Sequence, residues 1–332
     1  MKVVRFHEFG GPEVLRVENL PDPQPGPGEV RVRAEAIGVG VPDILMRRGN
    51  YEWIPPLPVI PGNELAGTVD AVGDGVEALG VGDQVYVNSR ELPQRGGGYA
   101  EAMVVPASAV FAMPDNVEAA QAVALGNYQL AWLLLNYAST PRAGDRILVH
   151  AAAGGVGSAL VQVAKSMGLG VFGIAGSKAK ADYVTEQGAD AVIDRNAEDV
   201  GERVAELTGG DGVDFIYDSV AGPGLSNDFA MLAPMGMVVM FGYLGGDPDP
   251  DLFAHMRAKF GDSVAFRLFS IHVLDDKPVI RRGAMKSAMA ALAAGEISPH
   301  VHTTMPLAEA ADAHRLVEGG SVTGKVVLTP RN

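Results

Sequence analysis

Residues 144–165 read GDRILVHAAAGGVGSALVQVAK, and this stretch decides the fold. The apolar run at residues 146–150 predicts a buried strand that enters a turn of small residues. Ala151, Gly154 and Gly157 keep that turn free of bulky side chains, and a helix follows. A phosphate can approach backbone N–H groups at such a turn, and the start of the helix carries partial positive charge. The pattern predicts a pyrophosphate site of the Rossmann dinucleotide-binding type.

Strands and helices alternate along the chain after this stretch. We expect strands at residues 171–174, 191–193, 213–217 and 237–241, with helices at 155–167, 179–187, 198–207 and 225–232. This order is typical of a doubly wound parallel sheet. The strands are short apolar runs without alternation, which favours a sheet covered by helices on both faces. Residues 264–269 are expected to add a sixth strand at the edge.

The first 110 residues have a different composition, which is rich in Val, Gly and Pro. Short strands are expected at residues 30–36, 65–72, 83–87 and 100–105, and a helical stretch at 118–136. The tail reads as strand, helix and strand over residues 301–328, and we expect it to return to the first domain. The fold class is therefore α/β. The expected division is residues 1–122 with 274–332 as one domain, and 123–273 as the dinucleotide-binding domain.

Composition excludes several classes of function. The 332 residues carry a net charge of −14, which argues against binding nucleic acid or an anionic membrane through a basic surface. The chain has no cysteine, so disulfides, thiol catalysis, iron–sulfur clusters and cysteine-bound zinc are excluded. It shows neither a signal-peptide core nor an apolar run of membrane-spanning length. We expect a cytoplasmic protein with no membrane partner.

The end of the second expected strand bears on the choice of cofactor. An acidic residue there normally binds the adenosine 2′-hydroxyl of NAD. Residues 174–180 read IAGSKAK, without a carboxylate. The hydroxyl of Ser177 and the ammonium groups of Lys178 and Lys180 suit a 2′-phosphate, and Arg195 follows the third strand. The sequence favours NADP(H). The alternative is that these residues do not bind the cofactor. In that case Ser177 caps the next helix, both lysines are solvated and Arg195 lies on the surface.

Several short motifs are spread along nearly the whole chain. Around the phosphate turn they comprise Gly144-Asp145, Leu148, Ala152-Ala153-Gly154-Gly155, Gly157, Gln162 and Lys165. Elsewhere they comprise residues 10–15 (GGPEVL), Gly49 with Tyr51, 98–101 (GYAE), 217–220 (YDSV) and 323–328 (TGKVVL). In these residues the chain resembles the zinc-independent, zeta-crystallin-like quinone oxidoreductases of the medium-chain dehydrogenase/reductase superfamily.

The resemblance implies a GroES-like β-barrel at the N-terminus, completed by the C-terminal segment, with a Rossmann domain between. It also implies a homodimer in which the edge strand at residues 264–269 pairs with its counterpart. Zinc-containing relatives have a Cys near position 40 and a Gly-His-Glu triplet, whereas this chain has Gly40 and Gly62-Asn63-Glu64. We therefore expect no catalytic zinc. His300 and His302 are interpreted as polar surface, with a metal site as the alternative.

Without a Lewis acid, the resemblance implies hydride delivery from NADPH to a quinone or another α,β-unsaturated carbonyl compound. Tyr51 is the candidate catalytic residue, because the tyrosine of the Gly-x-Tyr motif is implicated in proton donation in enoyl-thioester reductases. A tyrosine that only lines the pocket is the alternative. The expected acceptor pocket comprises Gly40, Tyr51, Trp53 and Asn127. Trp53 is expected to form an aromatic wall or to pack against Pro55-Pro56.

The cofactor residues follow from the motifs and the strand order. Ala152, Gly154, Gly155 and Val156 are assigned to the pyrophosphate. The adenosine phosphate is assigned to Gly176, Ser177, Lys180 and Arg195, and the nicotinamide half to Ser219, Phe241 and Gly242. Core packing is the alternative for Phe241.

Two rival functions stay open. One is reduction of an enoyl-thioester or alkenal double bond by the same kind of enzyme. The other, from a different class, is an NADPH-binding sensor or structural protein without turnover. The sequence does not identify the acceptor, because residues near the expected nicotinamide site, such as Gly40 and Leu130, depart from those common in the family.

Overall fold

The computed structural model describes residues 1–330. The chain forms two compact units, one of residues 1–126 and 285–332 and the other of residues 127–284. The domain boundaries expected after residues 122 and 273 stay predictions, and residues 331–332 of the second expected segment lie outside the described residues. No helix within residues 1–330 is both long and apolar enough to span a membrane.

The second unit contains the predicted doubly wound sheet. Its strands are β8 (Arg146–Val149), β9 (Gly170–Ala175), β10 (Ala191–Asp194), β11 (Val213–Asp218), β12 (Leu232–Met240) and β13 (Ala265–Leu268). They lie in the order β10-β9-β8-β11-β12-β13, and every neighbouring pair is parallel. The strand order reverses between β8 and β11, so the crevice for a ligand is expected at the carboxyl ends of these two strands. As expected, β13 lies at the edge.

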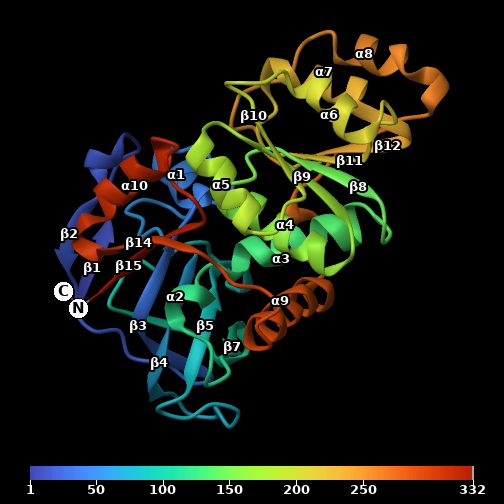
Figure 1. Ribbon diagram of the computed structural model, residues 1–332. Helices are drawn as coiled ribbons and strands as arrows, with labels where there is room; N and C mark the ends of the chain where they lie inside the picture. The colour runs from blue at the N-terminus through green and yellow to red at the C-terminus, as the bar shows by residue number, and fades with distance from the viewer. Residues whose placement is uncertain (331–332) are drawn as a thin grey trace. The chain divides into compact units, whose positions relative to one another are not determined.

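Helices cover both faces of this sheet. Figure 1 shows α4 (Gly155–Ser166) and α5 (Lys178–Glu186) on one side, with α6 (Val200–Thr208) and α7 (Leu225–Asp228) on the other. Side chains of β8 to β12 and of α6 and α7 form one apolar core. Burial on both faces is the reason that these strands read as apolar runs without alternation.

The stretch before β12 differs from the sequence prediction. The helix expected over residues 225–232 is a single turn, α7, followed by a 3-10 turn at Phe229–Met231. The strand begins at Leu232 instead of residue 237, and Met235 within it has a φ of 66°. In the sequence, Met235 followed by Gly236 resembles a turn. In the structure, the two residues form an irregularity within a paired strand. The sequence also did not predict α8 (Leu252–Ala258).

The first unit is built on a seven-stranded sheet. Its strands are β3 (Glu29–Val39), β4 (Glu64–Val72), β5 (Gln84–Asn88), β6 (Ala102–Pro106), β7 (Val110–Ala112), β14 (Val301–Pro306) and β15 (Lys325–Thr329). One edge of β3 pairs with β4, while β6 and β15 share the other edge. Register shifts between β3 and β4 bend these long strands, as the curvature of a barrel requires. The predicted return of the C-terminal segment to the first domain is confirmed.

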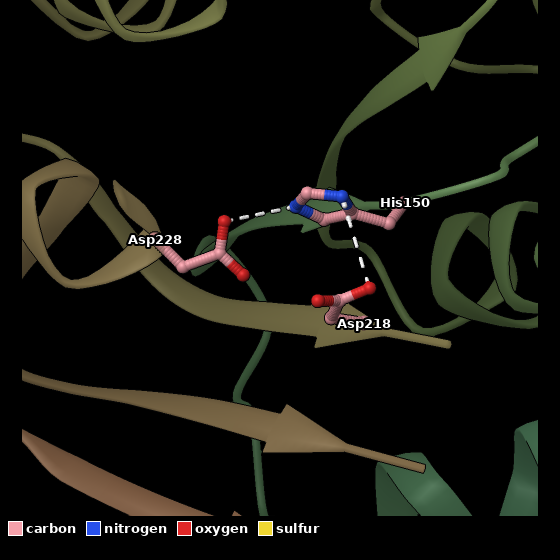
Figure 2. A group of neighbouring side chains, drawn as sticks. All are labelled: His150, Asp218 and Asp228. Atoms are coloured by element: carbon pink, nitrogen blue, oxygen red, sulfur yellow. Dashed lines mark hydrogen bonds and ion pairs between the residues drawn. The ribbon is translucent and has the colours of Figure 1, made fainter. Parts of the chain in front are cut away.

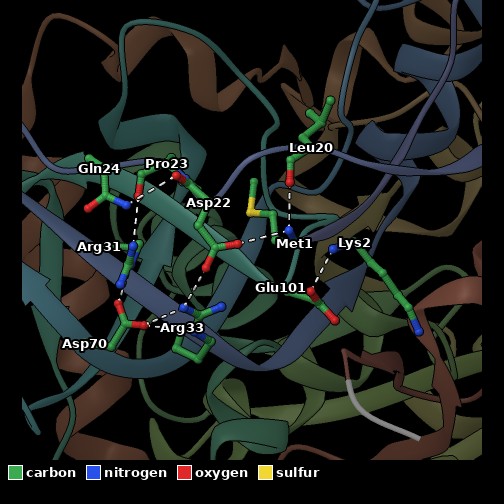
Figure 3. A network of polar contacts seen from close by, with 10 residues as sticks. All are labelled: Met1, Lys2, Leu20, Asp22, Pro23, Gln24, Arg31, Arg33, Asp70 and Glu101. Atoms are coloured by element: carbon green, nitrogen blue, oxygen red, sulfur yellow. Dashed lines mark hydrogen bonds and ion pairs between the residues drawn. The ribbon is translucent and has the colours of Figure 1, made fainter.

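The chain has further strands and helices besides these two sheets. They are the hairpin of β1 (Lys2–Arg5) and β2 (Arg16–Asn19), and the helices α1 (Val41–Arg48), α2 (Ala119–Ala122), α3 (Leu125–Leu133), α9 (Pro278–Ala293) and α10 (Ala310–Glu318). A polar network ties the start of the chain to β3 and β4 (Figure 3). The N-terminal ammonium of Met1 lies 2.9 Å from Asp22, which also binds Arg33. Asp70 in turn binds Arg31 and Arg33, each at 2.7 Å.

Candidate functional site

The phosphate turn lies between β8 and α4 in the second unit. The N–H of Ala152 donates to the carbonyl of Ile174 at 3.0 Å, and that of Gly154 donates to Ala151 at 2.9 Å. Ala152 and Gly154 therefore use their N–H groups to shape the turn. Ser158 makes the first intrahelical bond, to Gly154 at 2.9 Å. The N–H groups of residues 155–157 precede that bond and are the donors that the helix start presents to an anion.

Gly157 lets α4 pack directly on the turn. A Cβ atom at this position would overlap the carbonyl oxygen of Ala151 and would lie 2.7 Å from Cα of Ala152. Both obstacles are backbone atoms, which cannot move aside as a flexible side chain can. The third small residue of the motif thus fixes the distance between the helix start and the strand end.

Two basic side chains lie beside the ends of β9 and β10. A Cβ atom on Gly176 would lie 3.3 Å from Nη2 of Arg195, so the guanidinium lies over this glycine. Partial burial and the charge of Arg195 lower the pKa of Lys180. The Ser177 hydroxyl accepts the N–H of Lys180 at 3.4 Å, so its predicted capping role is present. Lys178 instead pairs with Asp182 at 2.8 Å. Lys180 and Arg195 form a cationic pair suited to a phosphate.

The residues assigned to the nicotinamide half follow β11 and β12. A Cβ atom on Gly242 would lie 2.6 Å from the carbonyl oxygen of Ser219, so the two strand ends are in contact there. Phe241 donates its N–H to the backbone carbonyl of Asp218 at 2.8 Å and is half-buried. All the residues assigned to the cofactor in the second unit therefore lie at the carboxyl edge of the sheet.

Asn127, which the sequence assigned to the acceptor pocket, lies at this same edge. A Cβ atom on Gly155 would lie 2.5 Å from its Nδ2 atom. The side-chain amide is therefore held against the first residue of α4. Glycine at position 155 is needed for this approach.

The candidate catalytic tyrosine belongs to the first unit. Tyr51 is 8% exposed and packs in a small apolar cluster with Phe6, Val14, Met46 and Val59. The ring of Trp53 meets it edge-on, with the ring centroids 5.5 Å apart.

Arginine side chains surround the Tyr51 hydroxyl. Burial raises the pKa of Tyr51, against the opposing charges of Arg90 and Arg95 and a hydrogen bond from Arg95. Because the oxygen accepts from a cation and the pKa stays above its ordinary value, the phenol keeps its own proton available for donation. Arg90 and Arg95 were not predictable from the sequence, because neither belongs to a recognisable motif.

A buried polar cluster fills the place where zinc-containing relatives have metal ligands. Gly40 has no side chain, and a Cβ atom there would lie 3.8 Å from the ammonium of Lys325. The amide of Asn63 donates to Asp43 at 2.7 Å and accepts from Ser89 at 2.5 Å. A glycine, an engaged amide and an ammonium group do not fit a zinc ion, which prefers imidazole, thiolate and carboxylate ligands.

Asp43 organises this cluster. It is 1% exposed, and it accepts N–H groups of Gly40 at 2.8 Å and Gly62 at 3.1 Å besides the amide of Asn63. Burial raises its pKa to about 6, against the N–H of Gly40 and the charge of Lys325. The group is ionised at neutral pH, as its three donors require. Through its bond with the N–H of Gly40, Asp43 also caps the start of α1.

Glu64 and Lys325 form a buried ion pair next to this cluster. The other carboxylate oxygen of Glu64 accepts from the Tyr86 hydroxyl and the N–H of Gly126, both at 2.8 Å. The pair joins β4 to β15 across 261 positions of sequence. Both residues belong to motifs of the sequence, but nothing in the local pattern shows that they meet.

Comparison with known proteins identifies the family. Residues 26–115 match the family described as "Alcohol dehydrogenase GroES-like domain", and residues 155–268 match "Zinc-binding dehydrogenase". The chain is 32% identical to the quinone oxidoreductase of Homo sapiens over 99% of its length and 97% of that protein.

Two solved structures have the same architecture over the full chain. One is the Escherichia coli quinone oxidoreductase complexed with NADPH (TM-score 0.88, 30% identity, 99% of this chain and 100% of that one). Another is a 2-haloacrylate reductase (TM-score 0.82, 30% identity, 100% of both chains). With its predicted α/β fold confirmed in both units, this chain belongs to the quinone oxidoreductase family of the medium-chain dehydrogenase/reductase superfamily.

Proposed function

We propose that this protein is an NADPH-dependent oxidoreductase that reduces a quinone or another α,β-unsaturated carbonyl compound without zinc. The observation that carries the proposal is the carboxyl edge of the parallel sheet, where a glycine turn with open N–H groups is followed by the cationic pair Lys180 and Arg195. The E. coli relative was solved with NADPH, and the haloacrylate reductase is named for a conjugated substrate. Gly40, Asn63 and Lys325, which occupy the place of the metal ligands in zinc-containing relatives, do not fit zinc and so support the last part.

Each group of residues has a proposed role toward the cofactor. The N–H groups of Gly155 and Val156 bind the pyrophosphate, while Ala152 and Gly154 shape the turn. Lys180 and Arg195 hold the 2′-phosphate over Gly176, with the Ser177 hydroxyl beside them. Residues 219, 241 and 242 border the nicotinamide. When bound, NADPH supplies a hydride to the acceptor.

Removing the Arg195 guanidinium tests the cofactor assignment. We expect Arg195→Ala to weaken NADPH binding about tenfold or more, because a charge-assisted hydrogen bond contributes about 1.5–3 kcal/mol. NADH lacks the 2′-phosphate, so its dissociation constant is expected to change less than twofold. Fluorescence titration with both cofactors measures this. Arg203→Ala removes an exposed arginine of α6 and serves as the control; equal losses for NADPH and NADH contradict the assignment.

Tyr51 is proposed to supply the proton that complements hydride transfer. In an enone, hydride addition to the β-carbon pushes an electron pair onto the carbonyl oxygen, and the resulting enolate takes a proton at the α-carbon. A phenol with a raised pKa holds that proton at neutral pH, and Arg95 beside its oxygen eases release of the proton. Trp53 and Gly40 are proposed as further parts of the acceptor pocket. A quinone is protonated on oxygen, where water suffices.

The substitution Tyr51→Phe separates these acceptor classes. We expect kcat for an enone and for an enoyl thioester to fall about 30-fold, within the range that general acids contribute, with a change in KM below threefold. Quinone reduction is expected to stay within threefold of the native rate. Steady-state NADPH oxidation with each acceptor measures this, and Tyr137→Phe on the second unit is the control. Unchanged rates on all acceptors would leave Tyr51 only a packing role.

We also propose a homodimer formed through the edge strand β13. Large apolar side chains that are more than half exposed gather in the surrounding segment, namely Phe253, Phe260, Leu268, Val273 and Val279. An open strand edge with apolar neighbours is a pairing surface. The cytoplasm is the proposed location, because a chain of 332 residues without cysteine is suited to a reducing compartment.

A further inference from the structure

Three ionisable side chains converge in the second unit at the point where the strand order reverses. His150 directly follows β8, Asp218 ends β11 and Asp228 ends α7. Figure 2 shows both carboxylates directed toward the imidazole of His150. Nε2 of His150 lies 3.0 Å from Oδ1 of Asp228, and Nδ1 lies 3.8 Å from Oδ1 of Asp218. None of the three residues has a role in the proposed reduction.

The contacts of the two carboxylates differ sharply. Each aspartate is 1% exposed. Asp218 accepts three backbone hydrogen bonds, from Val220 at 2.6 Å and from Ala221 at 3.1 and 3.0 Å. Asp228 has only the imidazole, and its Oδ2 atom is buried without a hydrogen-bond partner. A buried carboxylate oxygen without a donor is costly, so this atom calls for a cation.

We propose that His150, Asp218 and Asp228 bind one divalent metal ion of the zinc class. One imidazole nitrogen and two carboxylate oxygens form a ligand set that zinc accepts. The ion would give Oδ2 of Asp228 its missing partner and would place a positive charge between two buried carboxylates.

The geometry fits an ion after a small contraction. One ligand atom from each residue lies within 4.8 Å of the other two, and this is the only group of three such side chains in residues 1–330. Tetrahedral ligands at about 2.1 Å from zinc lie about 3.4 Å apart, so the side chains would move inward by about an ångström. The His150 side chain is 19% exposed, which leaves a path for the ion and for water as a fourth ligand.

Metal binding to the full chain tests the site. The protein is treated with a chelator, desalted and dialysed against Zn²⁺ alone, and bound zinc is measured by mass spectrometry. We expect the native protein to bind one equivalent of zinc per chain. The dissociation constant for zinc is expected to be at least tenfold higher in Asp228→Asn. His302→Asn removes an exposed histidine of β14 and is expected to bind zinc like the native protein. Circular dichroism confirms that the variants are folded.

Two further measurements keep the outcome decisive. His150→Gln is expected to lose binding as Asp228→Asn does, and it replaces that variant if the latter does not fold. Co²⁺ bound to the native protein is expected to show the visible absorption of a four-coordinate site with nitrogen and oxygen ligands. The proposal is overturned if the native chain binds no stoichiometric zinc, in which case a proton shared by His150 and Asp228 fills the site. It is equally overturned if both variants bind zinc as the native chain does.

Discussion

Gly157→Ala is expected to raise the dissociation constant for NADPH more than a hundredfold. Helix propensity alone favours alanine by about 1 kcal/mol at an interior helical position. Here the added methyl group meets the backbone of Ala151 and Ala152, so the start of α4 must shift away from the strand end. A displacement of about an ångström is enough to misplace the N–H groups of residues 155–157 toward a pyrophosphate.

The measurement is fluorescence titration with NADPH, together with urea unfolding. The chain offers a matched control in Gly283, which lies within α9, where a Cβ atom would meet nothing within 4 Å. Gly283→Ala is expected to stabilise the protein by about 0.5–1 kcal/mol and to leave NADPH binding unchanged. If the dissociation constant of Gly157→Ala for NADPH is within threefold of the native value, the close approach of helix and turn is not needed for cofactor binding.

Lys325→Met is expected to lower the free energy of unfolding by about 3–5 kcal/mol. The substitution keeps an apolar stem as far as the position of Cε but leaves Glu64 buried without its cation. The other hydrogen-bond donors to that carboxylate, the Tyr86 hydroxyl and the N–H of Gly126, cannot neutralise its charge. The loss follows from an uncompensated charge, so the double variant Glu64→Gln with Lys325→Met is expected to recover most of the stability.

Urea unfolding compares these variants. Lys165→Met serves as the control, because Lys165 forms an ion pair with Asp190 at 2.7 Å in which both side chains are at least one-third exposed. An exposed pair of this kind contributes less than about 1 kcal/mol. A free energy of unfolding for Lys325→Met within 1 kcal/mol of the native value would contradict this account. Burial of the Glu64 carboxylate without its cation would then have no cost.

The parts of the molecule that were predictable from sequence rest on local patterns. The phosphate turn is contiguous, and its residues 151–157 shape one another through bonds such as Gly154 to Ala151. The alternation of short apolar strands with helices follows from burial on both faces of a parallel sheet. The beginning of β12 at Leu232 was not predictable, because Met235 and Gly236 look like a turn although the strand continues through them.

The contacts that were not predictable join distant residues. Lys325 pairs with Glu64, yet nothing in the neighbouring sequence marks these partners. His150 and Asp228 are separated by 78 positions and belong to a strand end and a one-turn helix. Such pairs are produced by topology. Both β4 and β15 pair with β3, and β8, which His150 follows, pairs with β11.

Deuterium transfer from the cofactor tests the proposed function most directly. The native protein is incubated with an enone and with NADPH that carries deuterium at C4 of the nicotinamide, in separate reactions for the two faces. We expect the saturated ketone to carry one deuterium at its β-carbon from one of the two labelled cofactors, and none from the other. A protein that binds NADPH but yields no reduced product with enones or quinones, or a product without label from either cofactor, would contradict hydride delivery to a conjugated acceptor.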